Sequence, residues 1–425
     1  MLKRCLWMAL LIGLHAVKGQ GQSNPDSIYQ NSIHTVLIHP MNKPLAIPVV
    51  SLGEPIPLLI SFDDFKNDYQ DYYYSVELRN ADWSAVPMSA FDYLQGFNEN
   101  KISKFSVSSI ATQRYYHYEF SFPNAQSRPT QSGNYILKVF KNGNANELVF
   151  TRRFFVTEDG VSLAATVQEP FDAQISKTHQ KMQLVLDVKK IPFFQTDQIK
   201  TTIIQNYRYN DALTETAPTF IRGNLLEYNS ENIFIFPAGK ESRWLDIQNL
   251  RLRTDRIAEI NSKADRTIIS VKPDLSRAST AYYTFNDLNG NFIISNTESL
   301  QSENQNDYAQ VDFIYFPKDK IPFIGQQLYI AGALTNNILN KEAEMIFDPT
   351  LGYYKKSLLL KQGYYSYNYI LRDKETVNTM NDFTETEGNH WETENNYSIM
   401  IYYRPPGARH DHIIGFGTIN SRQNW

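Results

Sequence analysis

Cysteine is almost absent from this sequence of 425 residues. The single cysteine, Cys5, lies near the N-terminus, ahead of an apolar run typical of an export signal. A mature chain that begins after such a signal has no cysteine, so neither a disulfide nor an acylated cysteine can hold it, and no thiol is available for catalysis. We therefore expect its stability to come from packing alone.

Long apolar runs are also scarce. Residues 1–19 combine a basic start, an apolar stretch from Leu6 to Leu14 and small residues ahead of Gln20, which predicts a secretory signal peptide cleaved before Gln20. No later run reaches the roughly 18–20 apolar residues that a membrane-spanning helix needs. The sequence thus predicts an exported, soluble mature protein.

Neither sign of charge dominates. The formal net charge is −4 at pH 7, and loss of Lys3, Arg4 and Lys18 with the signal peptide takes it to −7. The charges are scattered along the chain, without the basic patch that binding to a phosphate backbone requires. We expect no nucleic-acid partner.

Aromatic residues, in contrast, are abundant. The chain has 27 Tyr and 25 Phe, with 19 Gly and 19 Pro between them. Aromatic residues favour half-buried strands, and glycine and proline supply the turns that many short strands need. This composition predicts an all-β protein made of tandem immunoglobulin-like β-sandwich domains with little helix.

Strict alternation supports that prediction. Between Tyr115 and Phe122, residues 116, 118, 120 and 122 are large and aromatic on one face, while the other face carries Tyr115, His117, Glu119 and Ser121. Such a pattern indicates a strand with one buried face. Polar turns on either side of residues 132–140 indicate antiparallel neighbours.

Polar breaks divide the mature chain into three expected sandwich domains at residues 20–158, 159–316 and 317–425. The strands expected in the first domain are 58–62, 72–78, 115–122, 132–140 and 151–156. Those expected in the second are 182–188, 199–205, 233–236, 267–271 and 281–285, with 244–246 and 250–256 in its second half. The third is expected to contain strands 328–331, 353–360, 364–371 and 397–403, followed by a tail with a strand at 412–416.

The sequence has none of the short motifs that would indicate an enzyme. Gly-x-Ser-x-Gly, His-Glu-x-x-His and the P-loop pattern are all missing. We therefore expect a non-enzymatic protein with no catalytic residue, no cofactor and no small-molecule substrate.

Two clusters resemble metal sites only loosely. Asp63, Asp64, Asp68 and Asp71 are acidic like a calcium loop but lack its spacing and its glycine, so a solvated hairpin tip is the favoured interpretation. His410 and His412, on either side of Asp411, would share a strand face but have no third ligand nearby. We expect no metal at either place.

The richest polar segment is 385–394, ETEGNHWETE. The residues that could form the catalytic site of a paired-carboxylate hydrolase, or a metal site, are Glu385, Glu387, His390, Glu392 and Glu394. A charged loop before the strand at residue 397 explains the same residues and is favoured.

A sugar-binding interpretation concerns the third domain. Residues 325–334 and 358–369 resemble the carbohydrate-associated sandwich of glycogen-branching and debranching enzymes, which stacks sugars on exposed tryptophans. This chain has Asn336 and Asn337 after the matching segment instead. Tyr365, Tyr367 and Tyr369 share one face, which is more typical of a packed sheet than of a binding platform.

Two ordered sets of short segments resemble the type IX secretion system plug proteins. The first set is NADW (80–83), YLQGF (93–97), YYHY (115–118), GNY (133–135) and RRF (152–154). The second is GAL (332–334), LKQGYY (360–365), EGN (387–389), TENNY (393–397) and YYR (402–404). The middle of the chain, residues 160–316, matches in layout only.

This resemblance implies a non-enzymatic periplasmic protein of Bacteroidetes-type bacteria, associated with the inner side of the outer membrane. It implies one partner, the outer-membrane translocon β-barrel of the type IX system, whose periplasmic opening the plug would close while no substrate is engaged. It carries over no interface motif, so no partner-contact residue is assigned. A periplasmic or surface glycan-binding sandwich protein is the alternative, and a periplasmic hydrolase comes third.

Overall fold

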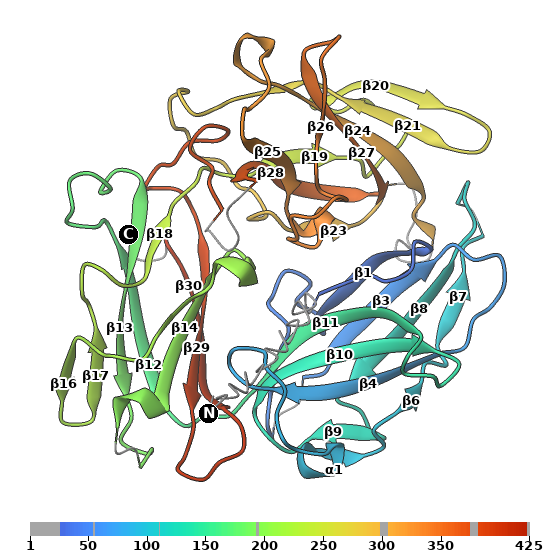
Figure 1. Ribbon diagram of the computed structural model, residues 1–425. Helices are drawn as coiled ribbons and strands as arrows, with labels where there is room; N and C mark the ends of the chain where they lie inside the picture. The colour runs from blue at the N-terminus through green and yellow to red at the C-terminus, as the bar shows by residue number, and fades with distance from the viewer. Residues whose placement is uncertain are drawn as a thin grey trace, which may run out of the picture.

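The computed structural model describes residues 26–53, 56–109, 111–192, 195–297, 305–374 and 381–422. Within these ranges the chain consists of packed β-sheets, and its one α-helix, α1 (Ala90–Tyr93), is a single turn (Figure 1). The prediction of an all-β chain of packed sheets with little helix is confirmed. None of the helices in these ranges has the length and apolar character to span a bilayer. The predicted signal peptide, residues 1–19 with Cys5, lies outside the described residues.

The first sandwich packs a four-stranded sheet on a five-stranded one around a core between residues 33 and 156. The four-stranded sheet has the order β1 (Ile33–Pro40), β3 (Leu58–Asp64), β8 (Tyr116–Phe122) and β7 (Phe105–Val107). The second sheet has the order β2 (Val49–Ser51), β11 (Leu148–Thr157), β10 (Gly133–Lys141), β4 (Tyr72–Arg79) and β6 (Asn100–Lys101). A small pair, β5 (Leu94–Gly96) and β9 (Ser127–Pro129), lies beside α1.

The second sandwich combines strands from distant parts of the chain. One sheet has the order β12 (Ser162–Gln168), β13 (His179–Asp187), β17 (Leu225–Tyr228) and β16 (Phe220–Arg222), with β18 (Ile235–Pro237) also on β13. The other has the order β15 (Leu213–Glu215), β14 (Ile199–Gln205), β29 (Asn396–Tyr403) and β30 (His412–Asn420). Alternation places Met182, Leu184 and Leu186 in the shared core, as predicted.

The third sandwich lies between these segments in the sequence. One sheet has the order β19 (Arg243–Asp246), β28 (Gly363–Asp373) and β23 (Phe292–Ile294), with β25 (Gln326–Ala331) on β28. The other has the order β20 (Ile257–Ser262), β21 (Thr267–Val271), β24 (Tyr308–Phe316), β27 (Tyr353–Lys361) and β26 (Ile346–Asp348), with β22 (Asp274–Leu275) on β24. Short 3-10 turns complete the described elements: η1 (Thr196–Gln198), η2 (Tyr209–Asp211), η3 (Lys318–Lys320) and η4 (Ala333–Thr335).

Strand pairing crosses the expected boundary between residues 316 and 317. β24 ends at Phe316 and pairs with β27, so residues on both sides of the boundary share one core. β14 pairs with β29 across almost two hundred residues and completes the second sandwich. The third domain is thus inserted into the second. Segments 250–256 and 281–285, expected as strands, contain none: turns and bends occupy most of the first, and the second has no strand partner among the described residues.

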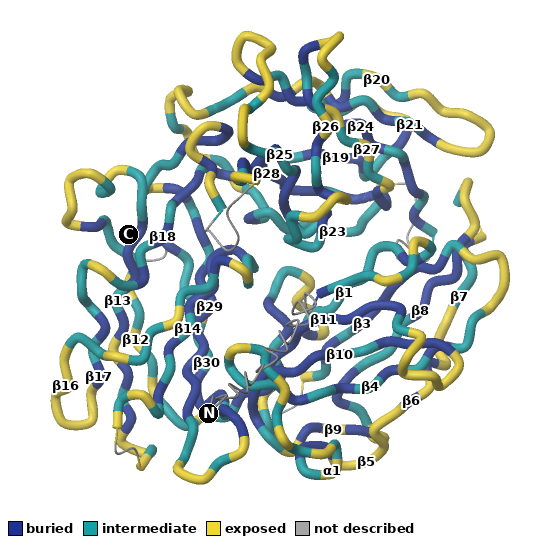
Figure 2. The backbone as a smooth tube through the Cα atoms, in the orientation of Figure 1, coloured by how far each residue is buried: buried dark blue, intermediate teal, exposed yellow. Residues whose placement is uncertain are grey.

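The three sandwiches surround a common centre (Figure 1). Figure 2 shows buried residues along the strands and exposed residues mainly at the loops. The face of residues 115–121 that the alternation predicts to be exposed is an exception, since Tyr115, just before β8, and His117 on β8 are buried. Their burial marks the joint between the first and third domains.

Candidate functional site

A buried polar cluster joins the first domain to the third. Asp63 at the end of β3 faces His117 on β8 across the sheet, and its carboxylate lies 2.6 Å from the His117 Nδ1. From the third domain, Lys361 Nζ donates to Asp63 at 2.6 Å and the Tyr308 hydroxyl donates at 2.5 Å. We call Asp63, His117, Tyr308 and Lys361 the Asp63 cluster.

The charges of the Asp63 cluster are stable because they compensate one another. Burial alone would disfavour the Asp63 carboxylate, but the positive charge of Lys361 and the hydrogen bond from His117 outweigh it, and the pKa of Asp63 lies below its ordinary value. The Lys361 ammonium also lies 4.6 Å from the centre of the Tyr115 ring, within range of a cation–π contact. The cluster is an ion pair across a domain joint, not an acid–base pair.

The expectation of a solvated hairpin tip around Asp63 is wrong for its first two carboxylates. Asp63 is 1% exposed and Asp64 0%, and Asp64 accepts a hydrogen bond from the Tyr72 hydroxyl at 2.7 Å. Asp68 is exposed, as expected, and Asp71 pairs with Lys101. Within the described residues no three metal-ligating side chains converge.

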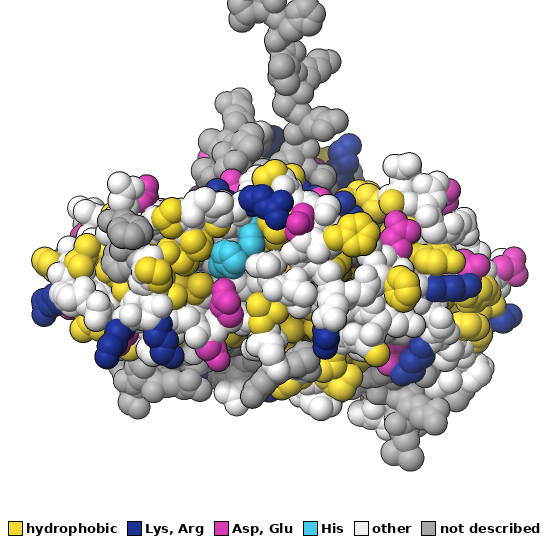
Figure 3. All heavy atoms as spheres, turned by 90° about the horizontal axis from the view of Figure 1, so that it is seen from below, with side chains coloured by type: hydrophobic (Ala, Val, Ile, Leu, Met, Phe, Trp, Pro, Cys, Tyr) yellow, Lys and Arg dark blue, Asp and Glu magenta, His cyan; other side chains and the backbone are white. Residues whose placement is uncertain are grey.

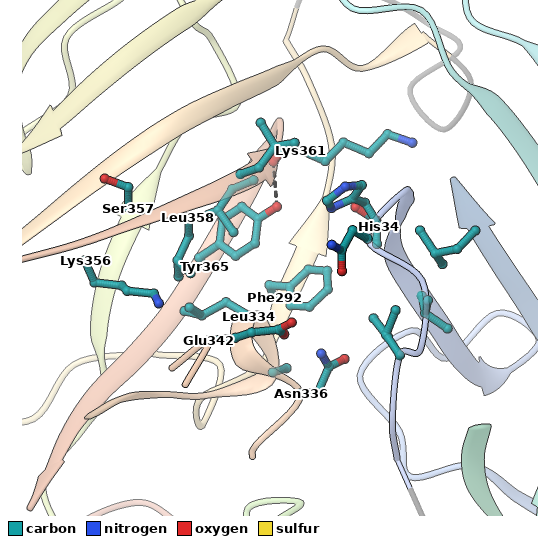
Figure 4. A pocket seen from close by; sticks show the side chains of 18 of the residues that line it. His34, Phe292, Leu334, Asn336, Glu342, Lys356, Ser357, Leu358, Lys361 and Tyr365 are labelled. Atoms are coloured by element: carbon teal, nitrogen blue, oxygen red, sulfur yellow. Dashed lines mark hydrogen bonds between the residues drawn. The ribbon is translucent and has the colours of Figure 1, made fainter. Parts of the chain in front are cut away.

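A cleft of about 340 Å³ lies beside the Asp63 cluster, between β1 and β27 (Figure 4). His34 lines it from β1, and Phe292, Asn336 and Lys356 line it from the third domain. β1 is the edge strand of its sheet. The lining mixes apolar side chains with charged ones, among them Glu342, Lys356 and Lys361.

The segment that resembles a sugar-binding module lies at this joint. The side-chain oxygen of Asn336 accepts a hydrogen bond at 2.7 Å from Arg152 of the first domain. Tyr365, Tyr367 and Tyr369 lie in the core of the third domain, as the packed-face interpretation predicted. These tyrosines therefore offer no flat exposed surface on which a sugar could stack.

A second joint, largely apolar, connects the first domain to the second. Its core is formed by side chains from both domains, namely Ile47, Phe155, Ile204, Met400, Tyr402 and Ile413. At its border Arg153 pairs with Asp26 at 2.6 Å and stacks over the Tyr209 ring at 4.2 Å. Apolar burial is therefore the main force that holds this pair of domains together.

His410 and His412 belong to this second joint. The buried His410 ring donates from Nε2 to the Ser132 carbonyl of the first domain at 3.0 Å, and the two histidine rings lie 4.0 Å apart. Asp411 pairs with Arg404 at 2.9 Å and accepts from the backbone N–H of Ala81 at 3.0 Å. The segment 410–412 thus holds two domains together.

Acidic pH should weaken this second joint. Burial, together with the neighbouring His412, lowers the pKa of His410 to about 4. An unfolded histidine titrates near 6.5, so between about pH 6.5 and 4 the unfolded chain binds a proton that the folded chain does not, and stability falls by roughly 2 kcal/mol by pH 5 and roughly 3 kcal/mol by pH 4. His410→Gln, which keeps a donor for Ser132, should flatten this dependence.

The measurement is urea unfolding of the wild type and of His410→Gln at pH 7 and pH 5. His39→Gln is the control, because that ring makes a local contact, with its Nδ1 3.0 Å from the carbonyl of neighbouring Pro40 in the first domain. If His410→Gln loses as much stability between the two pH values as the wild type and the control do, His410 is not the responsible group.

The segment 385–394 is a charged loop only in part. Glu385 and Glu392 are exposed, as expected, but Glu387 is 0% exposed. Arg243 Nε lies 3.0 Å from Glu387 and its Nη1 lies 2.7 Å from Asp274. We call Arg243, Asp274 and Glu387 the Arg243 network.

The Arg243 network is also charge-compensated. Burial opposes ionisation of Glu387, but Arg243 and Arg277 outweigh it, and the pKa of Glu387 lies below its ordinary value. Glu387 accepts from the backbone N–H of Tyr369 at 2.9 Å. The network therefore anchors the segment that returns from the third domain to the second, and its carboxylate is held ionised instead of being available as an acid.

Comparisons with known proteins found a family model and a solved structure that are similar to this chain. Residues 33–158 match the family model of the type 9 secretion system plug protein 1st domain, which confirms the resemblance carried by the first set of segments, 80–154. A crystal structure of a hypothetical protein from Parabacteroides merdae ATCC 43184 is 29% identical, covers 93% of this chain and 98% of its own, and superposes with a TM-score of 0.89. A search of curated proteins gives no match.

Proposed function

Taking as premise that residues 33–158 match the type 9 secretion system plug protein 1st domain, we propose that this protein closes the periplasmic opening of the type IX translocon barrel when no substrate is engaged. The family match is the observation that carries the proposal. The protein would act from the periplasm, at the inner side of the outer membrane, by protein contact and without catalysis.

The way the domains are joined supports a plugging role. The first domain is tied to the third by the Asp63 cluster and to the second by an apolar joint. The chain passes from the second domain into the third and later returns to the second, and Glu387 anchors the returning segment. A body that blocks a wide pore must resist deformation, and three mutual joints restrict hinge motion better than a linear array does.

A plug must also leave when a substrate arrives. We expect its contact with the barrel to be of moderate area and polar at its rim, like that of a transient complex. Loops at one end of the assembly are the expected contact, because sandwich loops gather at domain ends and vary without disturbing the core.

The test is purification of the tagged translocon barrel. We expect this protein to accompany the barrel when secretion is idle and to be depleted from it when a substrate is stalled in the pore. Deleting its gene should leave the barrel assembled and make the outer membrane more permeable to large solutes. The complemented deletion strain is the control.

Absence of this protein from idle barrels, with permeability unchanged in the deletion strain, would reject the plug assignment. Binding on a glycan array would then favour the glycan-binding alternative. The buried positions of Tyr365, Tyr367 and Tyr369 give that alternative no support at present.

A further inference from the structure

The outer face of the third domain carries a partly exposed apolar row. Leu275 on β22 is paired with Phe316 on β24, and the Phe316 ring lies 5.4 Å from that of Tyr353 on β27. The neighbouring residues Tyr315 and Tyr354 are buried in the core, so alternation turns Phe316 and Tyr353 outward. Leu275, at the end of this row, is 61% exposed.

Two adjacent loops extend this row beyond the sheet. Ile321 and Ile324, in the loop between β24 and β25, are 58% and 88% exposed, and Leu351, in the turn between β26 and β27, is 50% exposed. The loops lie side by side, because a Cβ built on Gly352 would meet the Lys320 side chain at 2.7 Å. We call Leu275, Ile321, Ile324 and Leu351 the outer apolar end; in Figure 1 the turn between β26 and β27 lies on the side of the third domain that faces away from the first.

Exposed lysines lie close in sequence to the outer apolar end. Lys318 and Lys320 precede Ile321 in the same loop, Lys272 precedes β22, and all three are exposed. Asp319 is the acidic side chain between the first two. The face seen from the opposite side of the molecule, in contrast, scatters both signs of charge (Figure 3). A basic rim is unexpected in a mature chain with a formal net charge of −7.

This composition identifies the kind of partner. Protein interfaces are rich in aromatic residues and arginine and poor in lysine, and leucine is rare among their energetic centres. Protruding aliphatic tips with lysine beside them are instead typical of surfaces that insert shallowly into lipid headgroups, with the ammonium groups at anionic phosphates.

We propose that the outer apolar end docks the protein on an anionic lipid surface. Ile321, Ile324 and Leu351 enter the headgroup layer, while Lys318 and Lys320 contact the phosphates. This interaction goes beyond the proposed function, because it requires a bilayer and no translocon.

Vesicle flotation with the full mature protein tests this inference. The probes are vesicles of phosphatidylethanolamine alone and vesicles that also contain phosphatidylglycerol. We expect binding to the mixed vesicles that weakens with added salt. Replacing Ile321, Ile324 and Leu351 together by serine should reduce the partition coefficient at least ~tenfold, because each exposed aliphatic side chain loses its burial.

Separate variants test the contribution of the lysine charges and the location of the binding surface. Lys318→Glu with Lys320→Glu should weaken binding to the mixed vesicles by about fivefold or more for each lysine. The control replaces three exposed apolar residues elsewhere, Phe91, Phe171 and Leu252, by serine and should bind like the wild type. Circular dichroism verifies that each variant is folded.

The inference is overturned if the wild type floats with neither kind of vesicle, or if the control triple variant loses binding as strongly as the first. It is also overturned if the serine variant abolishes capture by detergent-solubilised barrel while vesicle binding persists, because the partner is then a protein. Barrel capture in detergent tests the proposed function without a bilayer, so the two can fail independently.

Discussion

Asp63→Ala should lower the free energy of unfolding by about 3–5 kcal/mol, since removal of one partner from a buried ion pair leaves the other charge uncompensated. The Lys361 side chain is 2% exposed and would lose the carboxylate that lies 2.6 Å from its Nζ. The Tyr308 hydroxyl and the His117 ring would lose the same acceptor. Urea unfolding followed by circular dichroism, with each transition fitted separately, measures this effect.

The matched control is Glu169→Ala. Glu169 pairs with Lys177 at 2.8 Å, but the lysine side chain is 72% exposed, so the variant should lose less than about 1 kcal/mol. The double variant Asp63→Leu with Lys361→Met should recover part of the lost free energy of unfolding, because a buried apolar pair leaves no charge without a counter-charge. If Asp63→Ala costs no more than Glu169→Ala, the Asp63 cluster is not what ties the first domain to the third.

Arg243→Met should have an effect of similar size, about 3–5 kcal/mol, within the third domain. The variant keeps the apolar stem of the side chain but withdraws positive charge from two buried carboxylates, Asp274 and Glu387. Arg266→Met is the control from the same domain, because its ion pair with Asp265 is long, 3.8 Å, and exposed. Thermal and urea unfolding measure both variants.

The effect of Arg243→Met should depend on pH with a defined sign. The folded-state pKa of Glu387 is lowered, so the ionised carboxylate contributes stability above its ordinary pKa, near 4.5, and this contribution is lost as pH falls through the folded-state value. The difference between wild type and variant should therefore be largest at neutral pH and shrink below about pH 4. A difference that stays constant over this range would show that Arg243 acts through packing alone.

Local patterns in the sequence predict the strands of this protein well. Alternation identifies Met182, Leu184 and Leu186 as core residues, and the predicted segments 199–205 and 267–271 coincide with β14 and β21. These predictions succeed for one reason: the alternation of apolar and polar residues that marks a strand can be read from consecutive residues.

Long-range pairing is what the sequence could not provide. Nothing near residue 199 indicates that β14 pairs with β29, so local patterns place the boundary between the second and third domains at the wrong residue. Local patterns predict exposed positions for Asp63 and Glu387 for the same reason. Their counter-charges, Lys361 and Arg243, lie 298 and 144 residues away, and a charged residue without a visible partner is ordinarily exposed.

The insertion of the third domain has a consequence for the order in which the protein forms. A chain that emerges N-terminus first can complete its first core once residue 157 is available, whereas the second core must wait for β29 and β30, the last two strands. Until then β14 offers an unpaired edge to other chains. Pairing of residues 396–420 is therefore the last step in forming the second domain. A chain truncated before residue 396 would leave the other strands of this sandwich without their partners and prone to aggregation.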